Sequence, residues 1–82
     1  MSSFDFTVKD PEGIHARPAG IIVNAAKAMA AEIKITKGEK TIDAKKLFAL
    51  MGLGVKSGET ITVSSEDEGC LAEFKKVLEE NL

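Results

Sequence analysis

The only histidine of the chain, His15, stands among residues that could handle an anion. Because a proline is tolerated in the first turn of a helix, Pro18 predicts that a helix begins within a residue or two of His15. The start of a helix has unpaired N–H groups and a partial positive charge, and the Arg17 guanidinium suits phosphate oxygens. The same positive charge favours the neutral imidazole, which is the nucleophilic form of this side chain.

The segment of residues 13–19, GIHARPA, resembles the active-site signature of HPr, the histidine-containing phosphocarrier of the bacterial sugar phosphotransferase system. Residues 43–54, DAKKLFALMGLG, extend the resemblance, which covers essentially the whole chain. It implies that phosphorylated enzyme I donates a phosphoryl group to Nδ1 of the histidine and that enzyme IIA domains of sugar transporters receive it. The protein would then be a carrier rather than an enzyme. The implied roles are catalysis by His15 and Arg17, and phosphate binding by Ala16, Arg17 and Pro18.

Two other functions are compatible with the same residues. A small α+β domain could be a regulatory module that binds a partner or an effector without accepting a phosphoryl group. His15 argues against that function, because a domain that only docks needs no nucleophile. A carrier of the same fold could also serve a nitrogen-related phosphorelay instead of sugar uptake.

The composition predicts a single domain over residues 1–82 that folds without a disulfide or a metal. One histidine and one cysteine are fewer than the ligands of a zinc site, although carboxylates could bind harder metals. Neither a metal nor a cofactor is expected. The net charge of -2 has the wrong sign for bulk attraction to nucleic acid or anionic lipid. No apolar run approaches the ~20 residues that span a bilayer. The lack of a secretory signal and the lone cysteine favour the cytoplasm. We also expect a monomer.

Hydropathy periodicity predicts alternating strands and helices. Alternation of apolar and polar residues is typical of strands with one buried face, and apolar residues three and four apart are typical of helices that pack on a sheet. The order βαββαβα predicts an α+β, two-layer open-faced sandwich, and the resemblance implies a four-stranded antiparallel sheet with three helices on one face. The predicted elements are a strand from residue 4 to 10, a helix over 16–30, a hairpin of residues 32–36 and 40–43, a short helix over 46–51, a strand over 60–64 and a final helix after residues 66–68.

The short second helix carries more apolar residues than one buried face can hold. Leu50 and Leu53 share one face at a spacing of three. Phe48 and Met51 share another, so at least one pair is expected at the surface. The resemblance favours the leucine pair inside and a docking surface for partners near His15. The predicted docking residues are Gly20, Ile21, Asn24, Lys45, Leu47, Phe48 and Met51.

A lysine occupies the position at which many HPr proteins carry a regulatory serine. The resemblance locates that serine at the start of the short helix, where this chain has Lys46. An ammonium group cannot form a phosphoryl ester, and its charge is opposite to the charge that phosphorylation adds. We therefore expect this regulation to be absent. Lys46 could instead form a small basic face for acidic partners, together with Lys45 and Arg17.

Overall fold

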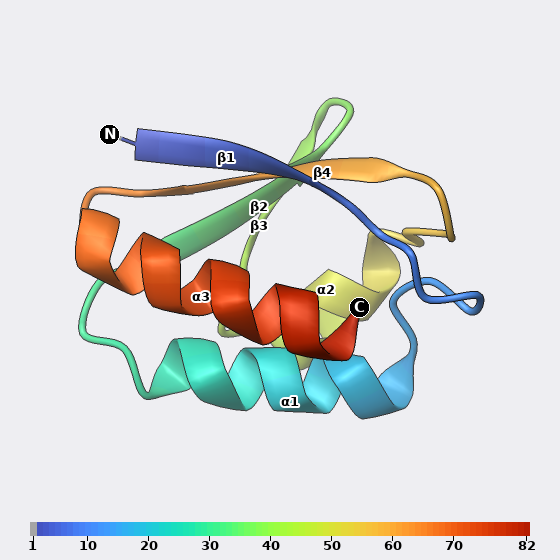
Figure 1. Ribbon diagram of the computed structural model, residues 1–82, viewed down its shortest axis with the longest axis horizontal. Helices are drawn as coiled ribbons and strands as arrows, with labels where there is room; N and C mark the ends of the chain where they lie inside the picture. Colours follow the sequence, from blue (N-terminus) through green and yellow to red (C-terminus); the bar gives the residue numbers. More distant parts are fainter. Residues whose placement is uncertain (1) are drawn as a thin grey trace.

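Three helices cover one face of a four-stranded sheet and leave its other face open (Figure 1). The computed structural model describes residues 2–82. Its element order, βαββαβα, confirms the predicted α+β open-faced sandwich. The elements are β1 (Ser2–Thr7), α1 (Ala16–Lys27), β2 (Ile33–Lys37), β3 (Lys40–Asp43), α2 (Leu47–Gly52), β4 (Thr60–Ser65) and α3 (Glu68–Asn81).

The sheet is antiparallel throughout, with the spatial order β1-β4-β2-β3. Val63 of β4 is paired with Phe4 on one side and with Ile35 on the other, so these three side chains share the face that the helices cover. The open face is polar: the Thr62 hydroxyl donates to the Asp5 carboxylate at 2.7 Å. β4, although the last strand in the sequence, lies between β1 and β2 in the interior of the sheet.

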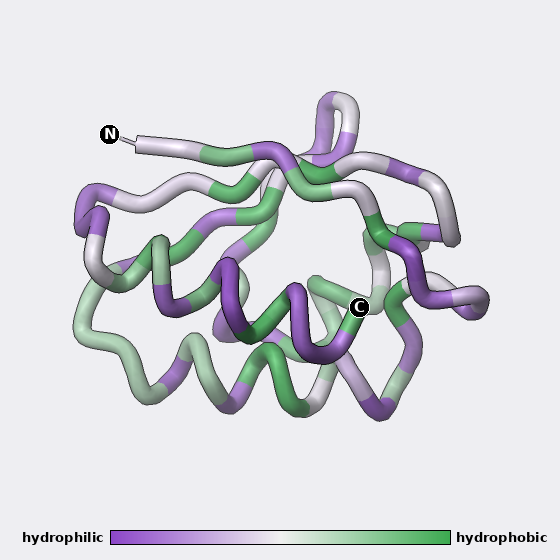
Figure 2. The backbone as a smooth tube through the Cα atoms, in the orientation of Figure 1, coloured by the Kyte–Doolittle hydropathy of each residue, from purple (hydrophilic) through white to green (hydrophobic). Residues whose placement is uncertain are grey.

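The core lies between the sheet and the helices. Each helix contributes a fully buried side chain to it, namely Ile22 from α1, Leu50 from α2 and Phe74 from α3. These side chains form one apolar cluster with those of the strands. Hydrophobic and hydrophilic segments alternate along α3 in Figure 2, as expected of a helix with one buried face. Among residues 2–82, none of the helices has the length and apolar character that crossing a bilayer requires.

β1 ends three residues earlier than predicted, because the backbone from Val8 onward bonds outside the sheet. The Val8 N–H donates to the Glu59 carbonyl at 3.0 Å, and the Val8 carbonyl accepts the Gly58 N–H at 2.7 Å. The Lys9 N–H donates to the Leu82 carbonyl at 3.1 Å. The chain therefore leaves the sheet and reaches the end of α3 before it turns into α1.

α1 also ends earlier than predicted. The Ala28 N–H is shared between the carbonyls of Asn24 and Ala25, both at 3.2 Å, and the Met29 N–H donates to the Ala26 carbonyl at 3.1 Å. Bonds that reach back only three residues tighten the last turn and close a helix. The apolar periodicity continues past this point, which is why the sequence predicted a longer helix.

Candidate functional site

His15 is the N-cap residue of α1, as the position of Pro18 predicted. Its backbone is extended, and its carbonyl accepts the first helical hydrogen bond from the Ala19 N–H at 2.9 Å. The N–H groups of Ala16 and Arg17 have no acceptor within residues 2–82, and Pro18 has no N–H to donate. The helix start therefore presents two free N–H groups next to the imidazole.

A close backbone contact at Gly13 fixes the loop that leads to the histidine. Gly13 has a φ of 70°, and its N–H donates to the Asp10 carbonyl at 2.9 Å, which closes the turn. A Cβ atom at this position would collide with the carbonyl oxygen of Val55. That same oxygen accepts the Ile14 N–H at 3.0 Å. Only glycine combines the positive φ with this contact, so the loop holds the backbone of His15 in place.

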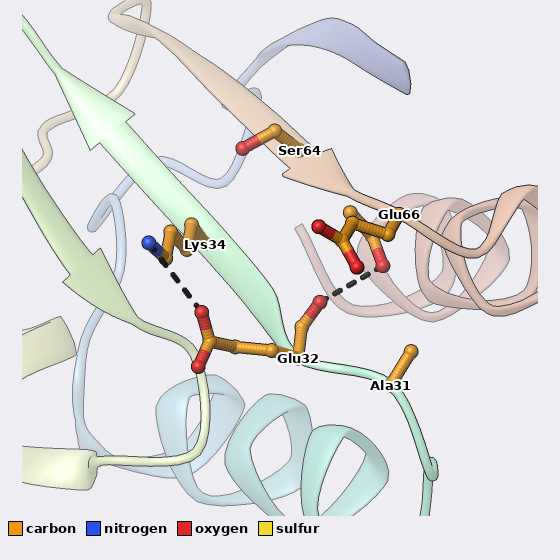
Figure 3. Close-up of a pocket in the computed structure, with 6 residues that line it drawn as sticks. Ala31, Glu32, Lys34, Ser64 and Glu66 are labelled. Atoms are coloured by element: carbon orange, nitrogen blue, oxygen red, sulfur yellow. Dashed lines mark hydrogen bonds and ion pairs between the residues drawn. The ribbon is translucent and has the colours of Figure 1, made fainter. Parts of the chain in front are cut away.

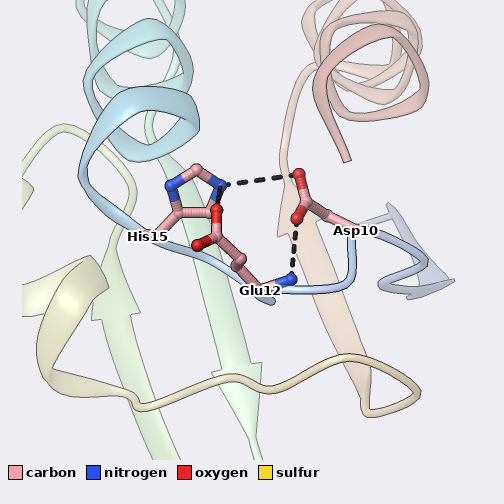
Figure 4. A group of neighbouring side chains, drawn as sticks. All are labelled: Asp10, Glu12 and His15. Carbon is pink, nitrogen blue, oxygen red and sulfur yellow. Dashed lines mark hydrogen bonds and ion pairs between the residues drawn. The ribbon is translucent and has the colours of Figure 1, made fainter.

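Two carboxylates face one nitrogen of the imidazole (Figure 4). Oδ2 of Asp10 and Oε2 of Glu12 each lie 3.5 Å from Nε2 of His15. The other nitrogen, Nδ1, lies on the opposite side of the ring, away from both carboxylates (Figure 4). The His15 side chain is 34% exposed, so a partner can reach the ring.

Neither carboxylate was predicted from the sequence to belong to the site. The signal was present, because a turn of residues 10–13 folds Asp10 back toward the helix start and Glu12 precedes the histidine by three residues. Asp10, Glu12 and His15 also offer oxygen and nitrogen atoms that all lie within 4.8 Å of one another, as metal ligands do. The expectation of no metal stays a prediction.

An open pocket of about 340 Å³ surrounds the imidazole. Three parts of the chain form it, namely the loop before α1, the first turns of α1 and the last turn of α3. The contribution of α3 was not predicted, because nothing local in the sequence shows which helix end packs beside the loop. The lining residues are Asp10, Glu12, His15, Arg17, Pro18, Ile21, Glu80 and Asn81.

Apolar side chains are exposed on α1 and α2. Phe48 is 85% exposed, Ile21 44% and Met51 38%. Leu50 and Leu53 are buried, as predicted. Because α1 and α2 pack against each other, these exposed side chains belong to neighbouring elements (Figure 1).

The remaining predicted docking residues differ in their surroundings. Asn24 is exposed and Gly20 is half-buried, both on α1. Leu47 is half-buried and packs against the core, which separates it from the exposed side chains of α2. The expectation that Leu47 lies outside is therefore met only in part.

Lys45 does not lie with the other predicted docking residues. Its ammonium donates to the Met29 carbonyl at 3.2 Å, just beyond the C-terminal end of α1 and thus at the end opposite His15. A cation is favourable there, because the last carbonyls of a helix carry a partial negative charge. The basic face expected from Lys45, Lys46 and Arg17 is therefore not assembled, although Lys46 is exposed at the N-cap of α2 as predicted.

A second ammonium holds α2 in place. Nζ of Lys37 donates to the carbonyls of Leu53 at 3.3 Å and Gly54 at 3.0 Å, at the C-terminal end of α2, and lies 3.1 Å from a Glu59 carboxylate oxygen. The Lys56 N–H donates to the same carboxylate at 2.7 Å. The hydrogen bond from Lys56, followed by that from Lys37, holds the pKa of the Glu59 carboxyl below its ordinary value.

A second hollow, of about 290 Å³, lies at the end of the sheet near the loop between α1 and β2 (Figure 3). Its polar groups bond with one another: the Ser65 hydroxyl donates to the Glu32 carbonyl at 2.8 Å, and the Glu32 carboxylate lies 3.4 Å from Nζ of Lys34. These contacts tie the start of β2 to the end of β4. The hollow therefore has a structural explanation and is not our candidate site.

The open-faced βαββαβα sandwich with its histidine at the start of the first helix defines a class of small phosphorylation-site proteins. Residues 2–80 match the family model described as "PTS HPr component phosphorylation site". The chain belongs to this family of the phosphotransferase system, and its members are phosphocarrier proteins that form phosphohistidine.

Relatives cover most of the chain. It is 35% identical to phosphocarrier protein HPr of Mycoplasma genitalium, over 99% of this chain and 97% of that protein. It is 43% identical to phosphocarrier protein HPr of Lysinibacillus sphaericus, over 83% and 80%. A multiphosphoryl transfer protein of Xanthomonas campestris is 35% identical over 90% of this chain, which spans only 9% of that much longer protein.

Solved structures agree with the fold. The crystal structure of HPr-C-His from Thermoanaerobacter tengcongensis superposes with a TM-score of 0.91 at 28% identity, and covers 99% of this chain and 94% of that one. A phosphocarrier protein HPr from Bacillus anthracis gives a TM-score of 0.86 at 30% identity, over 94% and 95%. Both share the antiparallel sheet and three helices described above.

Proposed function

We propose that His15 accepts a phosphoryl group on Nδ1 from phosphorylated enzyme I and passes it to enzyme IIA domains of sugar transporters. The observation that carries the proposal is the N-cap position of a reachable imidazole beside the free N–H groups of Ala16 and Arg17. Family membership supports it, because the matched family is defined by its phosphorylation site.

The proposed transfer requires little covalent chemistry from the protein. The Nδ1 lone pair of His15 bonds to phosphorus while the bond between phosphorus and the donor breaks, and its electron pair stays with the donor. The charge on the phosphoryl oxygens is stabilised by the N–H groups of Ala16 and Arg17 and by the Arg17 guanidinium. Pro18 completes the phosphate site by fixing the first turn of α1. Since the group is taken up and handed on in partner active sites, the protein acts as a carrier and not as an enzyme.

Incubation with enzyme I and labelled phosphoenolpyruvate tests this proposal. The wild-type protein should acquire one phosphoryl group, and the bond should be labile in acid because it is a phosphoramidate. His15→Ala should fold and acquire none. Label on the alanine variant, measured by mass spectrometry of the intact protein, would contradict the assignment to His15.

Arg17→Ala should also fold, but should accept the phosphoryl group more slowly. An electrostatic contact to the transition state is worth roughly 10²-fold in rate when its donor is well placed. Rapid-quench measurement of the transfer from enzyme I gives this rate. An unchanged rate would remove Arg17 from the mechanism.

We also propose a docking surface formed by the exposed apolar side chains of α1 and α2. An exposed aromatic side chain next to a methionine is suited to a site that must accept several partners. Lys45 is left out, because its ammonium is engaged at the far end of α1. The proposed docking residues are Gly20, Ile21, Asn24, Phe48 and Met51, with Leu47 at the margin of the surface.

The proposal includes a single phosphocarrier domain over residues 1–82 that works as a monomer in the cytoplasm. The family match over residues 2–80 and the single apolar cluster support the extent of the domain. Related structures include an HPr dimer from Thermoanaerobacter tengcongensis, with a TM-score of 0.75 at 29% identity. Sedimentation of this chain with and without enzyme I would test the monomer.

A further inference from the structure

The Asp10 carboxylate is held in a fixed orientation against the imidazole. One of its oxygens, Oδ1, accepts the Glu12 N–H at 2.9 Å, and this bond turns the other oxygen, Oδ2, toward Nε2 of His15 at 3.5 Å (Figure 4). The Asp10 side chain is only 24% exposed, whereas that of Glu12 is 75% exposed. Glu12 faces the same nitrogen, but its contact is screened by water and costs more side-chain entropy.

A carboxylate next to one ring nitrogen determines where the imidazole carries its hydrogen. An ionised carboxylate can only accept hydrogen bonds, so Nε2 carries the hydrogen when it faces Asp10. In the neutral ring Nδ1 then has the free lone pair. The separation of 3.5 Å is slightly longer than a hydrogen bond of about 2.7–3.2 Å, and a small ring rotation would close it.

We infer that Asp10 is a positioning residue for phosphoryl transfer, which holds the imidazole with its hydrogen on Nε2 and its lone pair on Nδ1. The inference rests on the function proposed for His15. When Nδ1 bonds to phosphorus, its lone pair becomes the new bond, the donor keeps the electron pair of the bond that breaks, and Nε2 keeps its hydrogen. The ring therefore becomes positively charged, and Asp10 stabilises that charge.

The other charged groups of the pocket differ from Asp10 in their position. Glu80 reaches the pocket from the last turn of α3, and Arg17 from the first turn of α1. Neither is in ion-pair contact with the imidazole within residues 2–82. Of the two carboxylates that are in contact, Asp10 alone is oriented by a backbone hydrogen bond.

Asp10→Asn tests the inference with almost no change of shape. The amide oxygen can still accept the Glu12 N–H, so the amide nitrogen then faces Nε2. Because that nitrogen can only donate, it favours a lone pair on Nε2 and the hydrogen on Nδ1, which removes the nucleophile. We expect the Nδ1–H form of His15 to predominate in the variant and the initial rate of phosphorylation by enzyme I to fall about tenfold.

Two independent measurements test the position of the ring hydrogen and the rate of phosphoryl transfer. The ¹⁵N chemical shifts of the ring nitrogens, recorded at alkaline pH with a chelator present to keep the three-residue cluster free of cations, report the position of the hydrogen without any phosphoryl transfer. The rate is measured with phosphorylated enzyme I. A wild-type protein that takes no phosphoryl group would contradict the proposed function. If the wild-type protein takes up the phosphoryl group and Asp10→Asn changes neither the ¹⁵N shifts nor the rate, the role of Asp10 is overturned while the proposed function stands.

Asp5→Asn is the matched control, because it makes the same change in charge on the open face of the sheet, where Asp5 accepts the Thr62 hydroxyl. It should leave the ring nitrogens and the rate unchanged. If the amide spectrum shows that Asp10→Asn disturbs the loop, Glu12→Gln changes the second contact without touching the bond to Asp10. It should move the same ¹⁵N shifts in the same direction by at most a smaller amount. Whatever the variants do, a wild-type ring that carries its hydrogen on Nδ1 would overturn the inference.

Discussion

The loop before α1 and the exposed face of α2 are built in opposite ways. The loop is polar at its surface, and backbone hydrogen bonds to residues 55–59 and to Leu82 fix its path. α2 is a short helix that buries Leu50 and leaves Phe48 and Met51 in water, and its end is held by the side chain of Lys37. Chemistry at His15 needs atoms held in place, whereas contact with several partners needs apolar area that can adapt. The two regions should therefore respond differently to substitution.

Gly13→Ala should have the largest effect and should act on the loop. It adds a Cβ where the Val55 carbonyl already lies and forces alanine to a positive φ, so we expect a loss of about 3 kcal/mol in the free energy of unfolding. Denaturant unfolding measures it. The control is Gly38→Ala in the hairpin, where φ is also positive but nothing lies within 4 Å, and the loss should be about 1 kcal/mol. Equal losses would show that the contact with Val55 contributes nothing.

Phe48→Asp should affect binding and leave stability nearly unchanged. Enzyme I binding should weaken by about 2 kcal/mol, as at interface hot spots, because an exposed aromatic side chain is replaced by a charge. Titration calorimetry measures the affinity, and thermal unfolding measures stability. Leu50→Ala on the buried side of the same helix should do the reverse and cost about 3 kcal/mol of stability. A large fall in thermal midpoint for Phe48→Asp would show that this side chain stabilises the fold and would end the docking proposal.

Glu59 should make the anchoring of α2 sensitive to acid. Its pKa is lower in the folded protein than its ordinary value of 4.5, so the stabilising contribution is complete above that pH and is lost as the pH falls through the folded-state pKa. The difference in unfolding free energy between wild type and Glu59→Gln should therefore shrink in acid. Urea unfolding between neutral pH and pH 3 measures it. A difference that is constant over this range would contradict the linkage.

Because Lys46 replaces the regulatory serine, a kinase that phosphorylates HPr on serine should leave this protein unmodified. Incubation with the kinase and ATP should leave the mass of the protein unchanged, because the side chain at the start of α2 cannot form the ester. A matched Lys46→Ser variant shows whether the kinase recognises this α2. Phosphate on any serine of the wild-type protein would reveal a substitute site.

The parts of the site that the sequence predicted are those set by neighbours along the chain. His15 was placed at a helix start because Pro18 restricts the first turn. The burial of Leu50 and Leu53 was also predicted from their spacing, with the resemblance choosing which face is inside. These features depend on short-range geometry that residue types record directly.

The features that the sequence did not predict depend on contacts between distant segments. The place of β4 between β1 and β2 follows from packing of the whole sheet, not from any pattern in β4. From the sequence, Lys45 is expected to be an exposed basic residue. Its ammonium instead lies at the end of α1, because the chain that follows β3 passes close to that end. In the same way, Glu80 reaches the pocket only because α3 ends beside the loop. Such contacts cannot be predicted from residue types along the chain.

The bond between the Lys9 N–H and the Leu82 carbonyl has a practical consequence for handling the protein. It places the last residue beside the loop that carries His15, whereas Ser2 pairs with Ser65 at the other end of the sheet (Figure 1). A purification tag or fluorescent label attached after Leu82 would therefore emerge next to the imidazole and compete with approaching proteins for space. The same label attached before Ser2 would stand clear of it, so assays of phosphoryl transfer should use tags at the amino end.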